Sequence, residues 1–124
     1  MNIYGIGIDI VEVQRIKKAI EKNKNFLTRV FHEEEIEMFE EKKYNILTIA
    51  GNFAAKEAFS KAIGTGIREF NFNDVIVLRD ELGKPYIKIN KNLKNICNHF
   101  RVQNIMVSIS HSKNYAVANC IVLN

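Results

Sequence analysis

The chain has 124 residues, of which 47% are hydrophobic and 26% charged, and its formal net charge is +4. That length suits one domain with a real core, so we expect a single domain over residues 1–124. No apolar run approaches the roughly 20 residues of a membrane span, and no signal-peptide pattern is present, which argues against a membrane partner. Cys97 and Cys120 lack metal-ligand spacing and are expected to be free, buried thiols of a cytoplasmic protein.

The charge is spread unevenly along the chain. Residues 11–30 carry six basic side chains against two glutamates, whereas residues 33–41 carry six glutamates and no base. A basic helix beside an acidic one is compatible with a solvated pair. It is also compatible with docking of an acidic partner, whether a nucleic acid, an acidic protein or a phosphorylated small molecule. Charge alone does not choose among these.

The first predicted element is a strand over Ile3–Ile10. Isoleucine at positions 6, 8 and 10 alternates with Gly5, Gly7 and Asp9, which is the period of a strand. Two glycines on one face allow another backbone or a helix to approach closely. Asp9 ends that glycine face. It is placed either to cap the following helix or to bind a metal ion at the end of a buried strand.

Periodicity and turn residues predict the remaining elements. The predicted helical ranges are Glu12–Lys24, Phe26–Phe31, Glu33–Lys43, Asn45–Gly64 and Leu93–Phe100. The predicted strands are Val75–Leu78, Tyr86–Ile89, Ile105–Ser110 and Tyr115–Val122, the first two joined as a hairpin in which Pro85 sits where a strand begins. This order predicts an α+β fold, with a mainly antiparallel sheet packed against a long buried helix and shorter helices.

The long helix over residues 45–64 carries charge toward the interior. It is apolar on nearly all sides, which is typical of a buried helix, and Glu57 falls near the centre of one apolar stripe, with Lys61 one turn later. An uncompensated buried charge is costly. One interpretation is an ion pair between Glu57 and Lys61 within the helix. The other is that Glu57 holds a metal ion and Lys61 faces an anion.

Polar residues at three separate places in the chain therefore stand out, namely Asp9, the pair Glu57 and Lys61, and His111. His111 follows the strand over residues 105–110, where a lone histidine is usually a loop or structural residue. Zinc spacings and the glycine-rich phosphate loops are absent. Two carboxylates from separate elements, Asp9 and Glu57, with no histidine or cysteine between them, fit Mg²⁺, which completes its shell with water and phosphate oxygens. Lys61 would then reach the same phosphates.

Four stretches resemble, in order and at matching spacings, the holo-(acyl-carrier-protein) synthases, the short bacterial type of 4′-phosphopantetheinyl transferase. They are GIGIDIVEVQRI at Gly5–Ile16, FAAKEAFSKAIGTGI at Phe53–Ile67, LGKPYIKI at Leu82–Ile89 and SISHSKNYAVA at Ser108–Ala118. The likeness runs over almost the whole chain, and the four motifs together are highly specific. The resemblance implies the phosphopantetheinyl transferase-like fold.

The resemblance also implies an activity. Such an enzyme moves the 4′-phosphopantetheine arm of coenzyme A onto a serine of apo acyl carrier protein, in fatty acid biosynthesis, and releases adenosine 3′,5′-bisphosphate. It implies Mg²⁺ between Asp9, Glu57 and the pyrophosphate of coenzyme A, in agreement with the independent interpretation of those two residues. It further implies that Lys61 contacts the phosphates, and that His111 with Ser112 lies near the adenosine 3′-phosphate.

Other parts of the resemblance concern the nucleotide pocket and the partners. The pocket would be lined by the hairpin residues Gly83, Lys84 and Pro85 and by the turn that contains Gly64 and Gly66. The basic helix, chiefly through Arg15, Lys18 and Lys22, would dock the acidic carrier protein. The family's members are homotrimers with active sites at subunit interfaces, which would explain why a short chain has no second domain to close its site.

Two residues depart from the family pattern, and two rival functions remain. Asn52 stands where many relatives carry an arginine that helps to bind the 3′-phosphate, and His32 stands where a threonine or serine usually caps a helix. One rival is a non-catalytic module that binds coenzyme A or a nucleotide, which need not keep metal ligands. The other is a basic nucleic-acid-binding domain, but the basic helix carries no exposed aromatic residue. We therefore expect no nucleic-acid partner. The base for the serine proton is either Glu57 or a water that it orients.

Overall fold

The computed structural model describes residues 1–64 and 70–124. Its strands are β1 (Ile3–Glu12), β2 (Val75–Arg79), β3 (Pro85–Ile89), β4 (Asn104–His111) and β5 (Tyr115–Leu123). Its helices are α1 (Val13–Lys22), α2 (Phe26–Val30), α3 (Glu33–Glu41), α4 (Ile46–Ile63) and α5 (Lys91–His99), with a 3-10 turn, η1, over Phe72–Asp74. Every predicted helix and strand is present, and each end lies within two residues of its predicted position.

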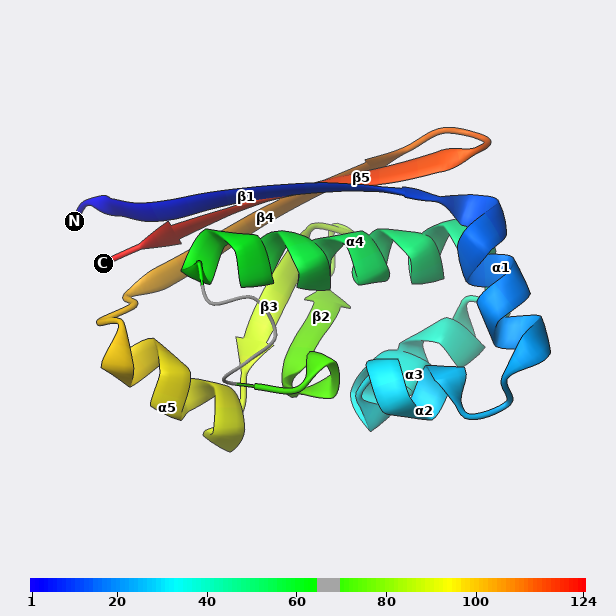
Figure 1. Cartoon of the computed structure of the whole chain (residues 1–124), viewed down its shortest axis with the longest axis horizontal. Coiled ribbons are helices and arrows are strands. Elements are labelled where there is room, and N and C mark those ends of the chain that lie inside the picture. Colours follow the sequence, from blue (N-terminus) through cyan, green and yellow to red (C-terminus); the bar gives the residue numbers. More distant parts are fainter. Residues whose placement is uncertain (65–69) are drawn as a thin grey trace.

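The long helix α4 lies in the middle of the molecule. Strands β1, β5 and β4 form one antiparallel sheet in that order, and β2 and β3 form a separate antiparallel hairpin. The three-stranded sheet covers one side of α4, while the hairpin and the helices α2, α3 and α5 lie on its other side (Figure 1). The predicted fold class is thus confirmed, with the strands divided between two sheets. The N- and C-termini lie next to each other, joined by backbone hydrogen bonds between Asn2 and Asn124.

The close approach predicted for the glycine face of β1 is confirmed. A Cβ atom at Gly7 would lie 1.8 Å from the carbonyl oxygen of Ala58, and one at Gly5 would lie 1.9 Å from that of Ala62. No side chain fits at either position, so the bare backbone of the strand touches the backbone of the helix. This contact sets the distance between β1 and α4. It also places Asp9, two residues beyond Gly7 on the same face, beside the helix.

Asn45 and Gly64, the predicted ends of the long helix, cap α4. The side-chain oxygen of Asn45 accepts a hydrogen bond from the N–H of Leu47 at 2.9 Å. At the other end Gly64 has a φ of 89°, the left-handed conformation that favours glycine, and its N–H donates to the carbonyl of Ser60. Most residues between the caps are buried. Glu57 is only half-buried and Lys61 is exposed, so they occupy the one open edge of the helix.

Strand β1 is longer than predicted, which corrects the place of Asp9. The strand continues to Glu12 because β5 offers pairing partners as far as Tyr115, so Asp9 lies inside the strand, opposite Ala118. Glu12 occupies the cap position of α1 and makes no side-chain cap hydrogen bond. The cap role considered for Asp9 is therefore wrong. His111 is likewise the last residue of β4 and not a loop residue.

The face of the three-stranded sheet turned away from α4 is left open by the part of the chain that the structure describes (Figure 1). Ile6, Ile8 and Ile10 of β1 point to that side and are 61%, 59% and 64% exposed. Met106 of β4, aligned with Ile6 through β5, is also exposed. A stripe of large apolar side chains in contact with water is a typical mark of an interaction surface.

Two further predictions about the whole chain can be compared with the structure. Over the described residues, no helix combines the length and the apolar character needed to cross a bilayer. Cys97 and Cys120 are both free and buried, as predicted. Burial raises the pKa of the Cys120 thiol to about 12, so this thiol stays protonated at neutral pH.

Candidate active site

Two carboxylates from different elements face one cleft. Asp9 from β1 and Glu57 from α4 line a hollow of about 320 Å³. The other lining residues, from β1, α1, α2 and α4, are Ile10, Val11, Arg15, Ile16, Ala19, Phe26 and Phe53. The cleft thus brings together the two residues that the sequence predicts as metal ligands. It also places Arg15 of the basic helix beside them.

Lys61 joins this group from the next turn of α4. Its Nζ donates to the carbonyl oxygen of Ile8 at 3.0 Å and to Oδ1 of Asp9 at 3.3 Å. The Lys61 side chain is 54% exposed and that of Asp9 17%. The ion pair considered between Glu57 and Lys61 does not occur among the described residues, because Lys61 turns toward β1 instead. The interpretation that α4 buries this carboxylate and this ammonium is also corrected.

The environment of Glu57 disfavours its charged form. Burial raises the pKa of Glu57, the negative charge of Asp9 raises it further, and the charge of Lys61 lowers it. Two carboxylates that repel each other across a cleft are stabilised by a cation placed between them. Among the described residues, no three or more histidines, cysteines, aspartates or glutamates are grouped so that they could hold a metal ion. A metal ion here would therefore have two protein ligands and take the rest from water or phosphate, which is the habit of Mg²⁺.

A second hollow, of about 260 Å³, lies between the hairpin and the start of α4. Its lining residues are Lys42, Leu47, Thr48, Arg79, Gly83, Pro85, Ile109 and His111. The structure thus brings together Gly83, Pro85 and His111, which come from two of the four motifs. The hairpin turn is held by the side chain of Asp80, which accepts hydrogen bonds from the backbone N–H groups of Leu82 and Lys84, each at 2.9 Å.

Two cations that were not predicted from the sequence, Lys42 and Arg79, also line this second hollow. Arg79 is half-buried, and burial lowers its pKa while the negative charge of Glu35 opposes that shift. None of the ion pairs among the described residues includes Arg79. Its guanidinium donates only a long hydrogen bond, 3.4 Å, to the carbonyl of Leu78. A half-buried guanidinium, a lysine and a histidine line this hollow without an acidic side chain, which is a chemistry suited to an anion.

The two hollows lie at opposite edges of the three-stranded sheet. Asp9 is on the edge strand β1, His111 is on the other edge strand β4, and β5 runs between them. Of the other predicted residues, Lys84 and Ser112 are exposed, and in the sequence they adjoin residues that line the second hollow. Gly64 is exposed at the opposite, C-terminal end of α4. Gly66 lies outside the described residues. One chain therefore carries the predicted site residues in two separate groups.

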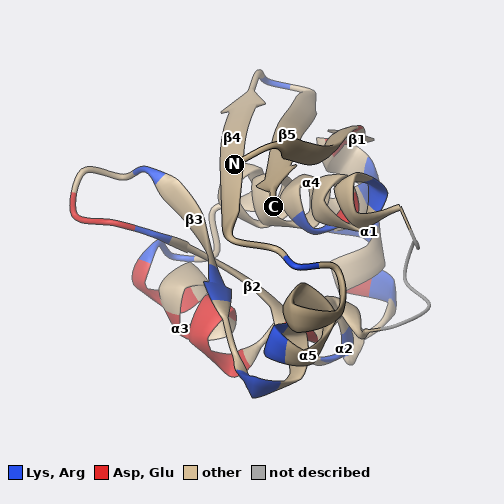
Figure 2. Ribbon diagram, turned by 90° about the vertical axis from the view of Figure 1, so that its left-hand side faces the viewer, with Lys and Arg blue, Asp and Glu red and all other residues tan. Residues whose placement is uncertain are grey.

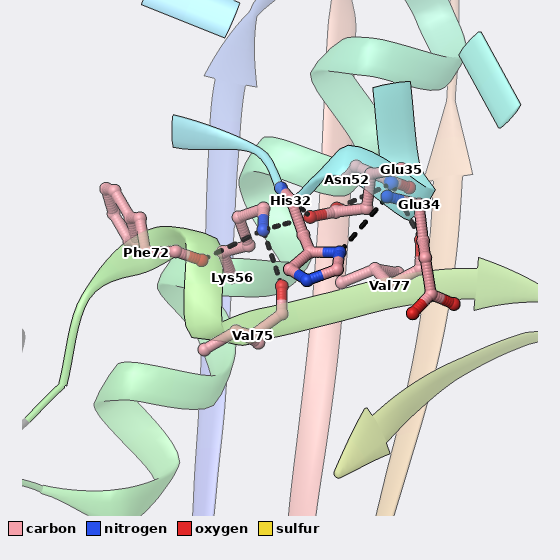
Figure 3. Close-up of polar contacts among 8 residues, drawn as sticks. All are labelled: His32, Glu34, Glu35, Asn52, Lys56, Phe72, Val75 and Val77. Carbon is pink, nitrogen blue, oxygen red and sulfur yellow. Dashed lines mark hydrogen bonds and ion pairs between the residues drawn. The ribbon is translucent and has the colours of Figure 1, made fainter. Parts of the chain in front are cut away.

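A buried polar network lies on another side of α4, and the sequence analysis missed it (Figure 3). Glu35, Asn52 and Lys56 are all fully buried. Lys56 forms an ion pair with Glu35 and donates to the carbonyl oxygens of Phe72 and Val75. Burial raises the pKa of Glu35 and lowers that of Lys56, and their mutual attraction opposes both shifts. Within the described residues, the fully buried carboxylate and ammonium are thus those of Glu35 and Lys56.

Asn52 belongs to this network and lines neither hollow. Its Nδ2 donates to Oε2 of Glu35 at 3.0 Å and to the carbonyl of Val77 at 2.9 Å, while its Oδ1 has no hydrogen-bond partner among the described residues. Asn52, which departs from the family pattern, therefore has a structural role in this chain. His32 also fills a structural role, because its Nδ1 accepts from the N–H of Glu34 at 3.1 Å and caps α3.

The basic and acidic helices do not pair with each other through the described residues. Acidic residues are concentrated on α3, where the ribbon is mostly red (Figure 2). Glu34 of this helix binds Lys88 of β3 at 2.8 Å. Arg15, Lys18 and Lys22 of α1 are exposed, and none of them takes part in the ion pairs of the described residues. The charges of α1 are thus exposed and unpaired within the described residues, which is compatible both with solvated helices and with docking of an acidic partner.

Comparison with known proteins gives the family. A family model described as the 4′-phosphopantetheinyl transferase superfamily matches residues 5–120. A holo-[acyl-carrier-protein] synthase from Clostridium botulinum (strain Alaska E43 / Type E3) is 55% identical over 120 residues, 97% of each chain. A crystal structure of the holo-[acyl-carrier-protein] synthase from Neisseria meningitidis has a TM-score of 0.91 and 32% identity, and covers 99% of this chain and 100% of that one.

A third match is a crystal structure of the Helicobacter pylori holo-[acyl-carrier-protein] synthase in complex with coenzyme A. Its TM-score is 0.85 at 37% identity, and the match covers 95% of this chain and 99% of that one. Because these matches extend over nearly the whole chain, they confirm the resemblance that the four motifs indicate. The chain belongs to the 4′-phosphopantetheinyl transferase superfamily, in the family of the holo-[acyl-carrier-protein] synthases.

Proposed function

We propose that this protein transfers the 4′-phosphopantetheine moiety of coenzyme A to a serine hydroxyl of apo acyl carrier protein, in fatty acid biosynthesis. The serine oxygen forms a bond to the phosphorus that bears the pantetheine arm, and the bond to the bridging oxygen breaks. Adenosine 3′,5′-bisphosphate then leaves with that oxygen. The observation that carries this proposal is the shared cleft of Asp9 and Glu57, with Lys61 bonded to Asp9, in a chain of this family.

The donor set of the cleft fits Mg²⁺, with Asp9 and Glu57 as its protein ligands. When bound, the ion would neutralise charge on the pyrophosphate oxygens. Lys61 is placed to stabilise the charge on the phosphates, since its ammonium is exposed and lies beside Asp9 of the cleft. Little covalent work falls to the protein in such a displacement, and positioning with charge neutralisation does most of it. The serine proton goes to Glu57 or to a water that Glu57 orients.

The second hollow is proposed to hold the nucleotide part of coenzyme A. Lys42, Arg79 and His111 line it without any acidic side chain, so it is suited to the phosphate that does not react, the 3′-phosphate. Gly83, Lys84 and Pro85 of the hairpin and Ser112 beside His111 would complete the pocket. Gly64 lies at the other end of α4, so it would contribute to this pocket only from a neighbouring copy of the chain.

The exposed bases of α1 are proposed as the docking surface for the acidic carrier protein. Arg15 lines the cleft of the two carboxylates, and Lys18 and Lys22 continue along the same helix, so a bound carrier would present its serine to the cleft. Charges of this kind act mainly on the association rate. Raised ionic strength should therefore increase the KM for the carrier protein more than the KM for coenzyme A, and equal effects would contradict the docking surface.

We infer that the active protein is a homotrimer of single-domain protomers. Two observations support a contact between copies: the exposed isoleucine stripe of β1, and the division of the site residues between two edges of one sheet. Packing of copies through that open sheet face would bury the stripe. It would also bring the carboxylates of one copy near the second hollow of the next. The substrates and the free thiols favour a cytoplasmic location.

A transfer assay tests the proposed activity. Purified protein, Mg²⁺, coenzyme A and apo acyl carrier protein are mixed. The mass of the carrier protein is then measured by mass spectrometry, and the added phosphopantetheine appears as a mass increase. We expect complete conversion with the natural chain and a loss of at least a hundredfold in kcat for Asp9→Ala and Glu57→Ala, with Glu41→Ala, an exposed change on α3, as the active control. A protein that binds coenzyme A but leaves the carrier unmodified would instead be the non-catalytic binding module.

A further inference from the structure

Helix α4 presents three faces with different tasks. At 100° per residue, the direction of Asn52 and Lys56 lies about 120° from the alanines that touch the glycines of β1, and about 140° from Glu57 and Lys61. The face with the alanines touches the sheet. The face with Asn52 and Lys56 lies against α3 and the hairpin, and the face with Glu57 and Lys61 is turned toward the cleft. The direction in which Glu57 points is therefore tied to the rotation of α4 about its own axis.

Apolar packing alone fixes that rotation only coarsely, because Gly5 and Gly7 admit the alanine face of α4 but small rotations keep similar areas buried. α4 is buried on most of its circumference, by the sheet on one side and by α1 and β2 on the others, with the Glu35 side chain of α3 reaching it. A helix that is apolar on nearly all sides buries similar areas at several rotations, because the hydrophobic effect is not directional. The contact with Gly5 and Gly7 sets how near the helix comes to the sheet. It involves small residues and backbone, which interlock less than large side chains.

The buried network supplies the directional contacts that packing lacks. Lys56 binds Glu35 of α3, the carbonyl of Phe72 in η1 at 2.9 Å and the carbonyl of Val75 in β2. Asn52, one turn earlier, binds Glu35 and the carbonyl of Val77. Hydrogen bonds weaken steeply when their angle or length changes. Glu35 is itself fixed, since one of its oxygens accepts from the N–H of His32 at 3.0 Å.

Stability alone does not account for such a network. A buried ion pair is often no more stabilising than a well-packed apolar group of the same volume, because desolvation offsets the attraction. The same burial makes the loss of one partner costly. A chain that needed only stability could hold apolar residues at these three positions, whereas an orientation requires directional bonds.

We propose that Lys56, together with Asn52 and Glu35, is a positioning group that sets the rotation of α4 and thereby holds the Glu57 carboxylate opposite Asp9. Lys56 directly precedes Glu57 in the chain, so any rotation at one is a rotation at the other. A rotation of about 20° would move a side-chain end by about 2 Å at the outer radius of a helix. A metal or catalytic site tolerates only about 0.5 Å. This inference rests on the proposed role of the two carboxylates.

The test replaces the network by apolar residues of similar size and measures metal binding directly. The variant Glu35→Leu/Asn52→Leu/Lys56→Met is compared with the natural chain for thermal unfolding, for the Kd of Mn²⁺ by electron paramagnetic resonance with and without coenzyme A, and for transfer kinetics. We expect a folded protein in which the Mn²⁺ Kd rises at least tenfold and kcat falls at least tenfold. The KM for the carrier protein should change less than twofold, because α1 is not altered.

Two further variants complete the comparison. Asn52→Leu alone removes two of the directional bonds and leaves the ion pair, so it should fold even if the triple variant does not, and the Mn²⁺ Kd should rise at least threefold. Leu93→Ala, a cavity change at a fully buried position in α5, lowers stability without touching the network. It should leave the Mn²⁺ Kd unchanged.

The inference is overturned if a folded network variant binds Mn²⁺ as the natural chain does, or if Leu93→Ala weakens binding equally. The proposed activity fails separately, through absence of transfer by the natural chain. In that case the Mn²⁺ measurement without coenzyme A still decides whether the network positions the two carboxylates.

Discussion

At the scale of single residues, burial and two charges act on the carboxylate of Glu57. Burial and the charge of Asp9 raise the pKa of Glu57, the charge of Lys61 lowers it, and the net result is a raised pKa. As the pH is lowered, Glu57 is therefore protonated at a higher pH than an ordinary glutamate. A metal ion competes with protons for this carboxylate. We therefore expect the Mg²⁺ concentration for half-maximal activity to increase as the pH is lowered, and to do so above the usual titration range of glutamate.

The sign of each contribution can be measured without metal. In the presence of a chelator, a carbon-13 titration should give a lower pKa for Glu57 in Asp9→Asn, which removes a repelling charge. It should give a higher pKa in Lys61→Met, which removes an attracting one. Glu41, exposed on α3, serves as the internal reference within each titration. A Glu57 pKa unaffected by Asp9→Asn would mean that the two carboxylates do not share the cleft.

Arg79 is a second residue with a specific prediction. Its guanidinium has no ionic partner among the described residues and lines the hollow proposed for the 3′-phosphate. Arg79→Ala should raise the KM for coenzyme A about tenfold or more, because a charge-assisted hydrogen bond is worth about 1.5–3 kcal/mol. The KM for 3′-dephospho-coenzyme A should change less than twofold.

Lys113→Ala, an exposed charge in the turn between β4 and β5, is the matched control for Arg79→Ala. It lowers the net charge by the same amount outside the hollow and should alter neither KM. Equal losses for both donors in Arg79→Ala would place the arginine elsewhere than at the 3′-phosphate.

At the scale of elements, the contact between β1 and α4 has no room for a methyl group. Gly7→Ala would place Cβ 1.8 Å from a backbone oxygen of Ala58, which cannot turn aside as a side chain can. We expect a loss of about 3 kcal/mol or more in the free energy of unfolding, measured by urea denaturation at one protein concentration, because overpacking forces the backbones apart.

Gly51→Ala provides the comparison within the same helix. Its Cβ would lie 2.9 Å from Cγ2 of Ile109, a side-chain end that can shift, and alanine favours the helix by about 0.5–1 kcal/mol. We expect a change near zero. If Gly7→Ala were as mild as Gly51→Ala, the strand and helix would not be held at backbone contact.

At the scale of the whole molecule, the open face of the three-stranded sheet is the feature that one chain leaves unexplained. Ile8 lies in the middle of its isoleucine stripe. Ile8→Arg should dissociate the proposed homotrimer, observed by sedimentation velocity, and abolish transfer, because the two groups of site residues would be separated. Leu82→Arg, an equally drastic change at an exposed hairpin residue, should leave the assembly intact.

A shared site predicts complementation between copies. Co-expression of Asp9→Ala and His111→Ala chains should give more transfer than either variant alone, since mixed assemblies contain sites with both groups intact. A monomer with full activity in either experiment would refute the proposed subunit interface.

Much of this protein is determined by local sequence pattern. The alternation of glycine and isoleucine in β1, the glycine cap of α4 and the turn residues of the hairpin act over a few residues, so their structures follow from the sequence. Asp9 and Glu57 were predictable as a pair because each carboxylate stands out against an apolar segment. The family resemblance adds the chemistry, since its motifs lie at matching spacings along the chain.

Only the tertiary structure decided which charges are buried and which partners they have. Because the helix is apolar on nearly all sides, its periodicity does not distinguish Lys56 from Lys61, and either lysine could be expected to be exposed. The packing of α3 and β2 against that side of α4 buries it, and Glu35, 21 residues away, compensates its charge. Arg79 and Lys42 meet His111 for the same reason, because a hollow is formed by segments that the sequence does not place side by side. Periodicity assigns a residue to a face, whereas the neighbour on that face is set by long-range packing.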